Sequence, residues 1–419
     1  MLLFYSLALV LVLILGSPYW LFRMATSGKY REGLRERLGF VPKRLLARSD
    51  GPVIWVHAVS VGELLAAARM IEELREKLPG RHIVVSTTTR TGQALARQRF
   101  GIENVFYFPL DFAFAVRAYL RALNPRLLVL VETEFWPRLL IECSRAGIPV
   151  AVVNARISDR SWPRYMRLRF LWKRLLNNFR LVLAQSETDL TRLRAIGAEN
   201  VCYGGNLKYD IRAAASAAVT KALAGQIATG TKVLVCGSTL EGEEQILLSA
   251  APSDVLVILA PRHPERFEAV ARLLERSGKP WVRRSQWMDA PTALAGGTVF
   301  LLDSIGELAS VYSLATVAFV GGSLVPGGGH NPLEAAQFRV PVVIGPHYEN
   351  FRAIVERLQA QDAIRIVHPT ELRNELTVLF SDEVFAHTIG ERAYSVFSSE
   401  AGATARAVAA LADIVGGQA

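Results

Sequence analysis

Two acidic residues in the first half of the chain stand where a carboxylate can do chemistry. Glu63 ends the motif HAVSVGE (57–63), and Glu132 opens the motif ETEFWP (132–137). Ser60 and Glu63 have the S-x-x-E spacing of a capping box, in which the carboxylate reaches back to the helix start. A carboxylate there can also act as a general base, because the positive helix end keeps it ionised. Spacing alone favours the cap, and the two roles compete for Glu63.

Glu132 and Lys208 each suit either a structural or a catalytic role. An acid in the first turn of a helix complements the helix dipole. At a cleft, the carboxylate of Glu132 can instead stabilise positive charge that develops on a sugar ring. Lys208 lies in GGNLKYD (204–210), where the chain leaves its first half. Such a lysine is usually a solvated surface charge, but at a hinge it can neutralise a phosphate or carboxylate.

The second half carries residues that suit phosphate binding. The motif PRHPERF (261–267) contains Arg262, whose guanidinium suits bidentate binding of a phosphate, and His263. A metal is disfavoured at His263, because no second ligand follows three or four residues later. Ser304 and Glu307 in DSIGEL repeat the S-x-x-E spacing, and capping accounts for much of that pattern.

The stretch FVGGSLVPGGGHNPLEAA (319–336) is the most informative one. A predicted strand gives way to a glycine-rich loop, and Asn331, Pro332 and Glu334 fit the N-cap, first and third positions of a helix. Glycines allow close approach of the backbone, and free N–H groups at a helix start attract a phosphate. No GxxxxGK[ST] motif is present, which argues against a P-loop NTPase. The chain also has no D-x-D motif, the usual carboxylates for metal-assisted binding of a diphosphate.

These motifs follow short apolar runs that alternate with helical patterns, which predicts an α/β protein with buried parallel sheets. The linker 211–230 separates a first domain (51–210) from a second (231–419), whose last helix can pack back on the first. Ligands bind at the carboxyl ends of parallel strands, so we expect the site in a cleft between two such halves. The predicted strands are 53–59, 82–88, 127–133, 149–155, 181–186 and 201–205, then 233–239, 255–261, 298–304, 317–323 and 341–346.

The N-terminal segment 1–22 has no charged residue and, as a helix, would reach ~33 Å, about one hydrocarbon core. We predict a membrane anchor here. Gly16, Ser17 and Pro18 interrupt the apolar run, so a tilted or half-inserted helix is the alternative. A cleaved signal peptide is disfavoured, because no basic residue precedes the run. The basic segment 23–50 predicts that the rest of the chain stays in the cytoplasm, against anionic lipid of the inner membrane.

Charge and cysteine content narrow the class of protein. Forty-eight Lys and Arg against 38 Asp and Glu give a net charge of +10, which favours anionic partners. The segment 156–180 carries eight basic residues and one acidic residue among aromatics at helical spacing. This pattern is typical of a core-facing helix with a solvated basic side, or of a helix on an anionic membrane. The segment 156–180 has no RNA-binding signature.

Three scattered cysteines argue against a disulfide framework and a structural zinc site, and indicate a reducing compartment.

Taken in order, the motifs of this chain resemble one family, the 3-deoxy-D-manno-octulosonic acid (Kdo) transferases of Gram-negative lipopolysaccharide synthesis. The resemblance implies a GT-B fold with two Rossmann-like lobes, the second of which binds most of the nucleotide. It also implies inverting, metal-independent transfer of Kdo from CMP-Kdo to the tetraacylated, bisphosphorylated lipid A precursor. The motifs are HAVSVGE, ETEFWP, NARISDRS, GNLKYD, EGEE, PRHPERF, GEL and GGSLVPGGGHNPLEAA.

By that resemblance, Glu63 is the proton acceptor that activates the sugar hydroxyl, which overrides the preference for a cap. Glu132 and Lys208 are stabilisers of the transition state. The resemblance implies no metal, no cofactor beyond the donor and no nucleic-acid partner. Two alternatives stay open: a membrane-associated GT-B transferase for another nucleotide sugar, and a non-catalytic protein that binds anionic lipid. The expected CMP site comprises Arg262, His263, Ile305, Gly306, Glu307, Asn331, Pro332, Leu333 and Glu334.

Overall fold

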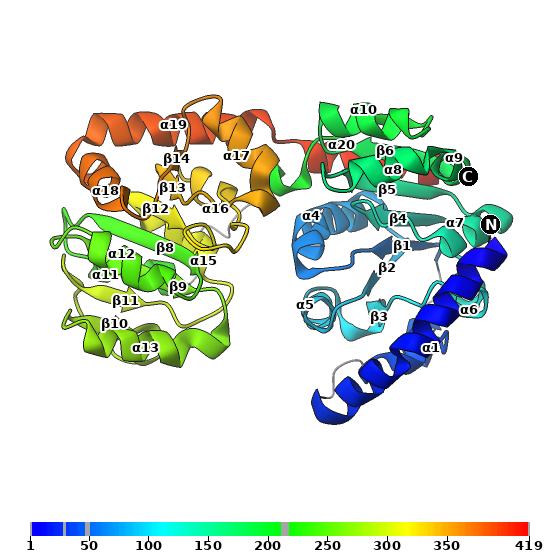
Figure 1. Cartoon of the computed structure of the whole chain (residues 1–419), viewed down its shortest axis with the longest axis horizontal. Helices are drawn as coiled ribbons and strands as arrows, with labels where there is room; N and C mark the ends of the chain where they lie inside the picture. Colours follow the sequence, from blue (N-terminus) through cyan, green and yellow to red (C-terminus); the bar gives the residue numbers. More distant parts are fainter. Residues whose placement is uncertain (1, 28–30, 47–50, 211–217, 418–419) are drawn as a thin grey trace. The chain divides into compact units, whose positions relative to one another are not determined.

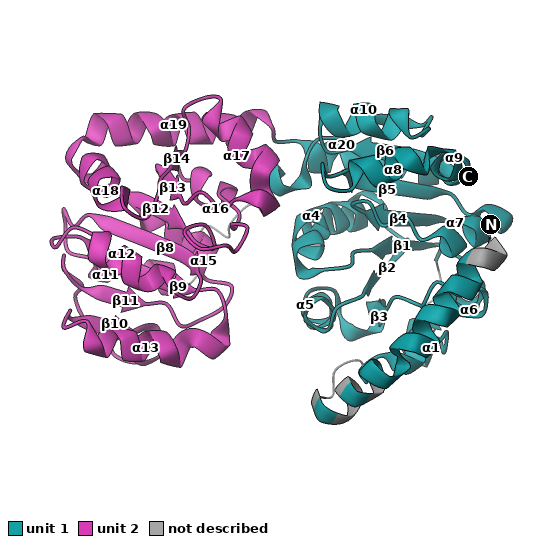
Figure 2. Ribbon diagram, viewed as in Figure 1, with its two compact units in different colours: residues 1–211, 401–419 teal, residues 212–400 magenta. Residues whose placement is uncertain are grey.

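The computed structural model describes residues 2–27, 31–46, 51–210 and 218–417. The chain divides into two compact units (Figure 2), of which unit 1 contains residues 1–211 and 401–419 and unit 2 contains residues 212–400. The C-terminal end therefore returns to the unit that contains the N-terminus. The predicted linker 211–230 lies partly outside the described residues, and its later part holds helix α11 of unit 2.

Unit 1 is built around a parallel sheet of order β3-β2-β1-β4-β5-β6-β7 (Figure 1). Almost every residue of the central strands is buried, as expected of a sheet with helices on both faces. The strands are β1 (Val53–His57), β2 (His82–Thr87), β3 (Val105–Tyr107), β4 (Leu127–Val131), β5 (Val150–Ala155), β6 (Phe179–Ala184) and β7 (Val201–Tyr203). The helices and 3-10 turns are α1 (Leu2–Ser27), α2 (Leu34–Arg37), α3 (Lys43–Leu46), α4 (Val61–Lys77), α5 (Arg90–Phe100), η1 (Ile102–Asn104), α6 (Ala113–Leu123), α7 (Pro137–Arg145), α8 (Trp162–Arg167), α9 (Arg169–Leu176), α10 (Glu187–Ala195), η2 (Leu207–Asp210) and α20 (Ala403–Gly416).

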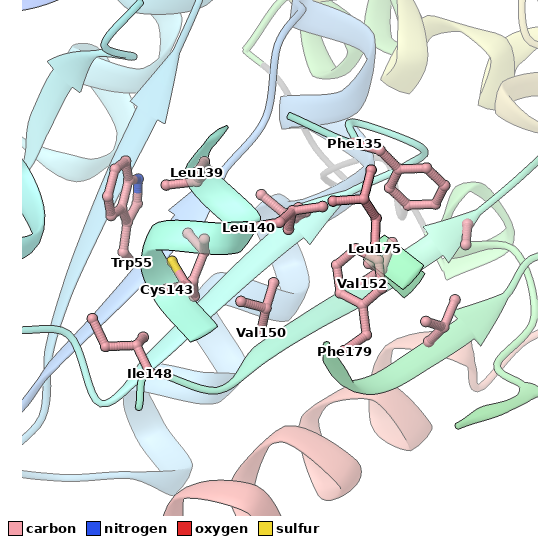
Figure 3. Packing of buried hydrophobic residues seen from close by; sticks show 14 of the residues in the cluster. Trp55, Phe135, Leu139, Leu140, Cys143, Ile148, Val150, Val152, Leu175 and Phe179 are labelled. Atoms are coloured by element: carbon pink, nitrogen blue, oxygen red, sulfur yellow. The ribbon is translucent and has the colours of Figure 1, made fainter. Parts of the chain in front are cut away.

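Each face of this sheet has its own apolar cluster, because successive side chains of a strand point to opposite faces. Trp55 belongs to the first cluster, where α7 covers the sheet, and Figure 3 shows Leu140 and Cys143 of α7 near Val150 of β5. Ile54 belongs to the second cluster, to which α4 and α20 contribute. Helix α20 thus completes the core of unit 1 although it follows unit 2 in the chain.

Unit 2 repeats the architecture with a parallel sheet of order β10-β11-β9-β8-β12-β13-β14. The strands are β8 (Val233–Thr239), β9 (Leu256–Pro261), β10 (Trp281–Arg283), β11 (Val299–Leu301), β12 (Val317–Val320), β13 (Val342–Ile344) and β14 (Arg365–Ile366). The helices and 3-10 turns are α11 (Ala218–Gln226), α12 (Glu243–Ala250), η3 (Pro264–Arg266), α13 (Phe267–Arg276), α14 (Arg284–Trp287), α15 (Leu308–Val311), η4 (Tyr312–Leu314), α16 (Leu333–Ala336), η5 (Glu349–Phe351), α17 (Arg352–Gln359), α18 (Leu372–Ser381) and α19 (Glu383–Ser399).

Helix α1 contains the segment expected to anchor the chain, and it continues through Pro18 without ending. The hydroxyl of Tyr5 donates a 2.8 Å hydrogen bond to Oδ2 of Asp111, which joins this helix to the rest of unit 1. Leu11, Ile14 and Leu15 of α1 are exposed. Within the described ranges, we find no helix with both the length and the hydropathy that crossing a bilayer requires.

Candidate active site

Glu63, Glu132 and Lys208 all lie at the carboxyl edge of the unit 1 sheet. Glu63 is in the first turn of α4, which follows β1, and Glu132 directly follows β4, the neighbour of β1 in the sheet. Lys208 is in the turn η2, beyond β7. Glu132 interacts electrostatically with both Glu63 and Lys208. The structure therefore gathers these three residues into one group, which we call the catalytic cluster.

The carboxylate of Glu63 is held by the start of its own helix. Its Oε2 accepts a 2.7 Å hydrogen bond from the backbone N–H of Val59, and its Oε1 accepts one of 2.9 Å from the hydroxyl of Ser60. The N–H of Glu63 donates in return to Oγ of Ser60 at 3.4 Å. The hydrogen bonds predicted for the cap are thus present, and they fix the orientation of the carboxylate without removing it from the cluster.

Burial raises the pKa of Glu63 to about 7, and the negative charge of Glu132 adds to the rise. The hydrogen bonds from Val59 and Ser60 oppose it, because they stabilise the ionised form. A carboxyl with a pKa near neutrality can take a proton from a hydroxyl and release it again at the same pH. The local environment therefore gives Glu63 the properties of a general base.

Glu132 adopts a backbone conformation that is rare for a residue with a side chain, with φ of 61°. Its N–H donates a 2.9 Å hydrogen bond to the carbonyl of Val153 on β5, so the turn stays attached to the sheet. Helix α7 begins only at Pro137 and has no acid in its first turn. The interpretation of Glu132 as a complement to that helix dipole is therefore wrong. Strained backbone of this kind is concentrated at functional sites.

Lys208 is half-buried rather than a solvated surface charge. Burial lowers the pKa of its ammonium group, whereas the negative charges of Glu132 and Glu63 raise it. The nearby guanidinium of Arg156 lowers it further. The ammonium group of Lys208 therefore lies beside two carboxylates. At this position it is suited to stabilise negative charge on a bound substrate.

Two residues that the sequence analysis did not single out hold the turn of Lys208. Asn154, at the end of β5, has φ of 57° and accepts a 3.1 Å hydrogen bond from the N–H of Leu207 through Oδ1. The buried carboxylate of Asp210 accepts hydrogen bonds from the N–H groups of Gly402, at 2.7 Å, and Thr404. The turn is therefore fixed on one side by the sheet and on the other by the start of α20. Asn154 lies in the motif NARISDRS and Asp210 lies in the motif GNLKYD, and these two motifs were the signal available in the sequence.

In unit 2, the expected nucleotide-binding residues follow three strands, β9, β11 and β12, at the carboxyl edge of its sheet. Arg262 and His263 come directly after β9 and are exposed. Burial raises the pKa of Glu334 to about 7, and the charge of Arg262 opposes that rise. Burial lowers the pKa of His330 to about 4, helped by the charges of Arg262 and His263. These four residues form a second electrostatically coupled group.

The glycine-rich loop between β12 and α16 differs from the sequence-based expectation. The N–H groups of Gly322, Ser323 and Leu324 all donate to the carboxylate of Glu243, at 2.7, 2.9 and 2.8 Å. The expectation of free N–H groups is therefore wrong for this part of the loop, because an internal carboxylate already occupies them. Glu243 belongs to the motif EGEE (241–244), whose sequence alone did not predict this role.

The helix start that follows the loop fits the prediction more closely. Oδ1 of Asn331 accepts a 3.2 Å hydrogen bond from the N–H of Leu333, as a capping residue does, but the helix begins one residue later than predicted, with Pro332 at the N-cap position. Pro332 is buried directly before α16, and Leu333 opens the helix. Anion binding by this part of the loop would therefore depend on Arg262 and the start of α16.

The segment 305–307 follows β11 and combines an exposed apolar side chain with a paired carboxylate. Ile305 is 65% exposed, and Gly306 next to it has φ of 89°. The carboxylate of Glu307 accepts from the hydroxyl of Ser304 and pairs with Arg284 at 2.7 Å. In the described part of unit 2, no hydrogen bond or ion pair joins this segment to Arg262 or Glu334. Its side chains thus offer an apolar surface at Ile305, while Glu307 stabilises the loop.

Known proteins resemble this chain in sequence and in fold. The family model described as 3-Deoxy-D-manno-octulosonic-acid transferase (kdotransferase) matches residues 32–211. The 3-deoxy-D-manno-octulosonic acid transferase of Bordetella pertussis is 34% identical over 416 residues, which cover 95% of this chain and 96% of that protein. The protein of the same name from Haemophilus influenzae is 33% identical over 399 residues, which cover 91% of each chain.

Solved structures with low sequence identity show the fold alone. The crystal structure of MurG from Acinetobacter baumannii is 15% identical and aligns with a TM-score of 0.52 over 82% of this chain and 95% of its own. UDP-GlcNAc 2-epimerase from Neisseria meningitidis is 15% identical, with a TM-score of 0.55 over 83% of this chain and 97% of its own. The expectation of two parallel-sheet α/β domains is thereby confirmed.

Proposed function

This chain belongs to the Kdo transferase family of glycosyltransferases, and from that membership we propose that it transfers Kdo from CMP-Kdo to a phosphorylated lipid A precursor. The family relationship supports a role in lipopolysaccharide synthesis. The observation that carries the mechanistic proposal is the catalytic cluster, in which an oriented carboxylate with a pKa near neutrality adjoins a lysine.

In the proposed reaction, the carboxylate of Glu63 takes the proton of the attacking sugar hydroxyl. The hydroxyl oxygen forms a bond to the anomeric carbon of Kdo while the bond from that carbon to the phosphate oxygen breaks. CMP leaves with the electron pair, and attack from the opposite face inverts the configuration. Glu132 stabilises positive charge on the Kdo ring, and Lys208 offsets the negative charge of the donor. Glu63 then returns its proton to water.

The donor site of the proposal is the group of residues at the carboxyl edge of the unit 2 sheet. Arg262 and the start of α16 offset the charge of the single phosphate, so the proposal needs no metal and no further cofactor. The carboxylate of Glu334 has no hydrogen-bond partner among the described residues, and it is suited to accept from a sugar hydroxyl of the nucleotide. The exposed side chain of Ile305 offers an apolar contact for the base.

We place the protein at the cytoplasmic face of the inner membrane in this proposal. The exposed apolar residues of α1, among them Leu11 and Ile14, supply a surface that can insert among acyl chains. Arg31, Arg35 and Lys43 are exposed just beyond that helix and can contact anionic headgroups. Flotation with vesicles that contain or lack an anionic lipid tests the location. Loss of flotation after deletion of residues 1–27 is the expected result.

Incubation of the purified protein with CMP-Kdo and lipid A precursor, followed by mass spectrometry, tests donor, acceptor and product together. We expect Kdo-modified product from the unaltered protein and none from Glu63→Gln, with CMP binding retained. Glu76→Gln is the matched control, because Glu76 is an exposed residue of the same helix. Near-normal transfer by Glu63→Gln would contradict the mechanism. Turnover of a UDP-sugar in place of CMP-Kdo would favour the alternative donor.

A further inference from the structure

A hollow with a volume of about 510 Å³ lies on unit 1 beyond the end of strand β5. Three arginines and two serines line it, and we call it the arginine pocket. Its lining residues are Ser158, Arg160, Ser161, Pro163, Arg164 and Arg167. This stretch belongs to the basic segment 156–180, and the pocket has no role in the proposed mechanism.

Local hydrogen bonds fix the loop that carries the two serines. The hydroxyl oxygens of Ser158 and Ser161 are 2.9 Å apart, and the N–H of Ser161 donates to Oγ of Ser158 at 3.3 Å. The carbonyl of Ser158 accepts from the N–H of Trp162, the first residue of α8, at 2.9 Å. Arg164 and Arg167 are three residues apart on α8 and therefore project from the same side of that helix.

The positive charges of the pocket are not neutralised by the protein itself. Across the described ranges, no carboxylate forms an ion pair with Arg160, Arg164 or Arg167. Asp159 is the one acid in the loop 156–161, and it pairs with Arg192. Arg192 is fixed in turn by a 2.7 Å hydrogen bond to the carbonyl of Ile157. Three like charges around one hollow repel each other, and a bound anion relieves that repulsion.

The donor set of the pocket matches a phosphate better than a carboxylate. Each guanidinium presents parallel N–H groups that fit two oxygens of a phosphate, and serine hydroxyls supply further donors. A dianionic phosphate monoester offers three oxygens to such donors and two negative charges to offset the three positive ones. A single carboxylate would leave most of the donors and charge unmatched.

The pocket also lies close along the chain to the catalytic cluster. Strand β5 ends at Ala155, and Arg156 follows it directly with a guanidinium that interacts electrostatically with Lys208. Ser158, two residues later, already lines the pocket. Both features therefore belong to the carboxyl edge of the same sheet, where an acceptor held at Glu63 can extend toward α8.

We infer that the arginine pocket binds a phosphate monoester of the acceptor while the sugar hydroxyl is at Glu63. The inference rests on the proposed function, and it names the acceptor group that unit 1 recognises. It accounts for the unpaired arginines and for the position of the pocket at the same sheet edge as the catalytic cluster. The same chemistry is offered by a phosphate-bearing lipid headgroup of the membrane, so the test must separate these two sources.

The test compares the double variant Arg164→Ala/Arg167→Ala with the unaltered protein in neutral detergent micelles that contain no anionic lipid. The acceptor is supplied with its phosphates intact or after phosphatase treatment. With the intact acceptor, we expect the KM for acceptor to rise by about tenfold or more, the size of effect typical of lost charged hydrogen bonds. The KM for CMP-Kdo, and the rate with dephosphorylated acceptor, should change less than about twofold.

The control variant is Arg121→Ala, which removes an exposed arginine of α6 that does not line the pocket. Unfolding midpoints of both variants show whether the substitutions leave the fold intact, as expected for exposed side chains. An unchanged acceptor KM in the double variant would overturn the inference, and so would an equal loss with both acceptors. Lost binding to phosphatidylglycerol vesicles with an unchanged acceptor KM would assign the pocket to a lipid headgroup and also overturn it.

Failure of the proposed function gives a different result. In that case the unaltered protein does not turn over CMP-Kdo with either acceptor. Equilibrium binding of the intact and the dephosphorylated precursor to the unaltered and double-variant proteins then decides the inference alone. A phosphate-dependent difference in affinity that disappears in the double variant supports the pocket, and its absence overturns it.

Discussion

The carboxylate of Glu243 accepts a 2.7 Å hydrogen bond from the backbone N–H of Gly322, 79 residues further along the chain. The same side chain also accepts from the N–H groups of Leu240, Ser323 and Leu324, so it satisfies four backbone donors. It is completely buried. A Cβ atom on Gly321 would lie 2.9 Å from Oε2 of Glu243 and closer still to the backbone of β8. The paired glycines therefore allow this carboxylate to approach the loop.

Substitution of Glu243 by Ala should destabilise unit 2. It leaves buried N–H groups without acceptors, and each such group costs about 1–3 kcal/mol, although the costs do not add fully. We expect a loss of about 3 kcal/mol or more in the free energy of unfolding, measured by urea denaturation. Glu241→Ala is the control, because Glu241 is exposed two residues earlier, and it should change stability by less than about 0.5 kcal/mol. Equal stability of the two variants would contradict the role assigned to Glu243.

The sequence predicted the central strands of both sheets and missed the edge strands β3, β10 and β14. Strands β10 and β14 each contain an arginine and are only half-buried, so neither shows a buried apolar run in the sequence. The packing of α20 on unit 1 was predicted from the sequence only as one possibility. It depends on contacts between residues some 200 positions apart, such as Arg406 with Gly204, and no local pattern encodes them.

The pH dependence of transfer should follow the ionisation of Glu63. A general base acts only when ionised, so kcat/KM should fall as the pH drops below about 7, the pKa of Glu63. Glu132→Gln removes a negative charge that raises this pKa, so the acidic limb should move to lower pH. Ser60→Ala removes a hydrogen bond that lowers it, so the limb should move to higher pH. Initial rates measured across two to three pH units on each side of about 7 show both shifts.

Thr89→Ala serves as the control for Ser60→Ala. Thr89 caps α5 by accepting from the N–H of Gly92 at 3.1 Å, without a carboxylate in the arrangement. Loss of the Thr89 hydroxyl should lower the free energy of unfolding by an amount similar to that for Ser60→Ala. It should leave the pH profile of kcat/KM unchanged. Shifts of the limb in the same direction for Glu132→Gln and Ser60→Ala would show that the proton acceptor is another group.

Asp210→Ala should separate catalysis from donor binding. The variant loses the acceptor for Gly402 and Thr404 at the start of α20, and loss of a helix cap costs about 1–2 kcal/mol. Because the turn η2 also carries Lys208, we expect a fall in kcat of about tenfold or more. CMP affinity, which we assign to unit 2, should stay within about twofold. Calorimetric titration with CMP and steady-state rates measure the two effects.

The matched control for this substitution is Asp382→Ala. Asp382 caps α19 in unit 2 by accepting from the N–H of Phe385 at 2.9 Å. Its replacement should cost about 1 kcal/mol of stability with kcat unchanged. A fall in kcat for Asp382→Ala as large as for Asp210→Ala would mean that lost stability alone explains the effect.

The candidate sites were predictable where a local pattern places a residue at the end of a strand. Glu63, Glu132 and Arg262 each follow an apolar run, and parallel strands bring such ends to one edge. In the glycine-rich loop, the N–H groups of Gly322 to Leu324 were expected to be free and instead bind Glu243, because the same glycines permit approach of a phosphate or of an internal carboxylate. Asn154 was not assigned a role, because its side chain holds a segment that is distant in sequence.

Glu334→Gln should stabilise unit 2 and weaken nucleotide binding. Burial raises the pKa of Glu334 from 4.5 to about 7, so the folded state holds a proton that the unfolded state releases between these values. Stability should therefore fall as the pH rises from 4.5 to about 7, and the neutral amide removes this dependence. At about pH 8 the free energy of unfolding of Glu334→Gln should exceed that of the unaltered protein by at most about 3 kcal/mol. Near pH 4.5 the two proteins should be equally stable.

The amide of Glu334→Gln is a poorer acceptor for a sugar hydroxyl, so the Kd for CMP should rise by about tenfold. Glu356→Gln, on the exposed side of α17, should change neither quantity. Urea denaturation at both pH values and titration with CMP provide the measurements. A variant that is less stable than the unaltered protein at pH 8 would show that the ionised carboxylate has a compensating partner and that its burial carries no cost.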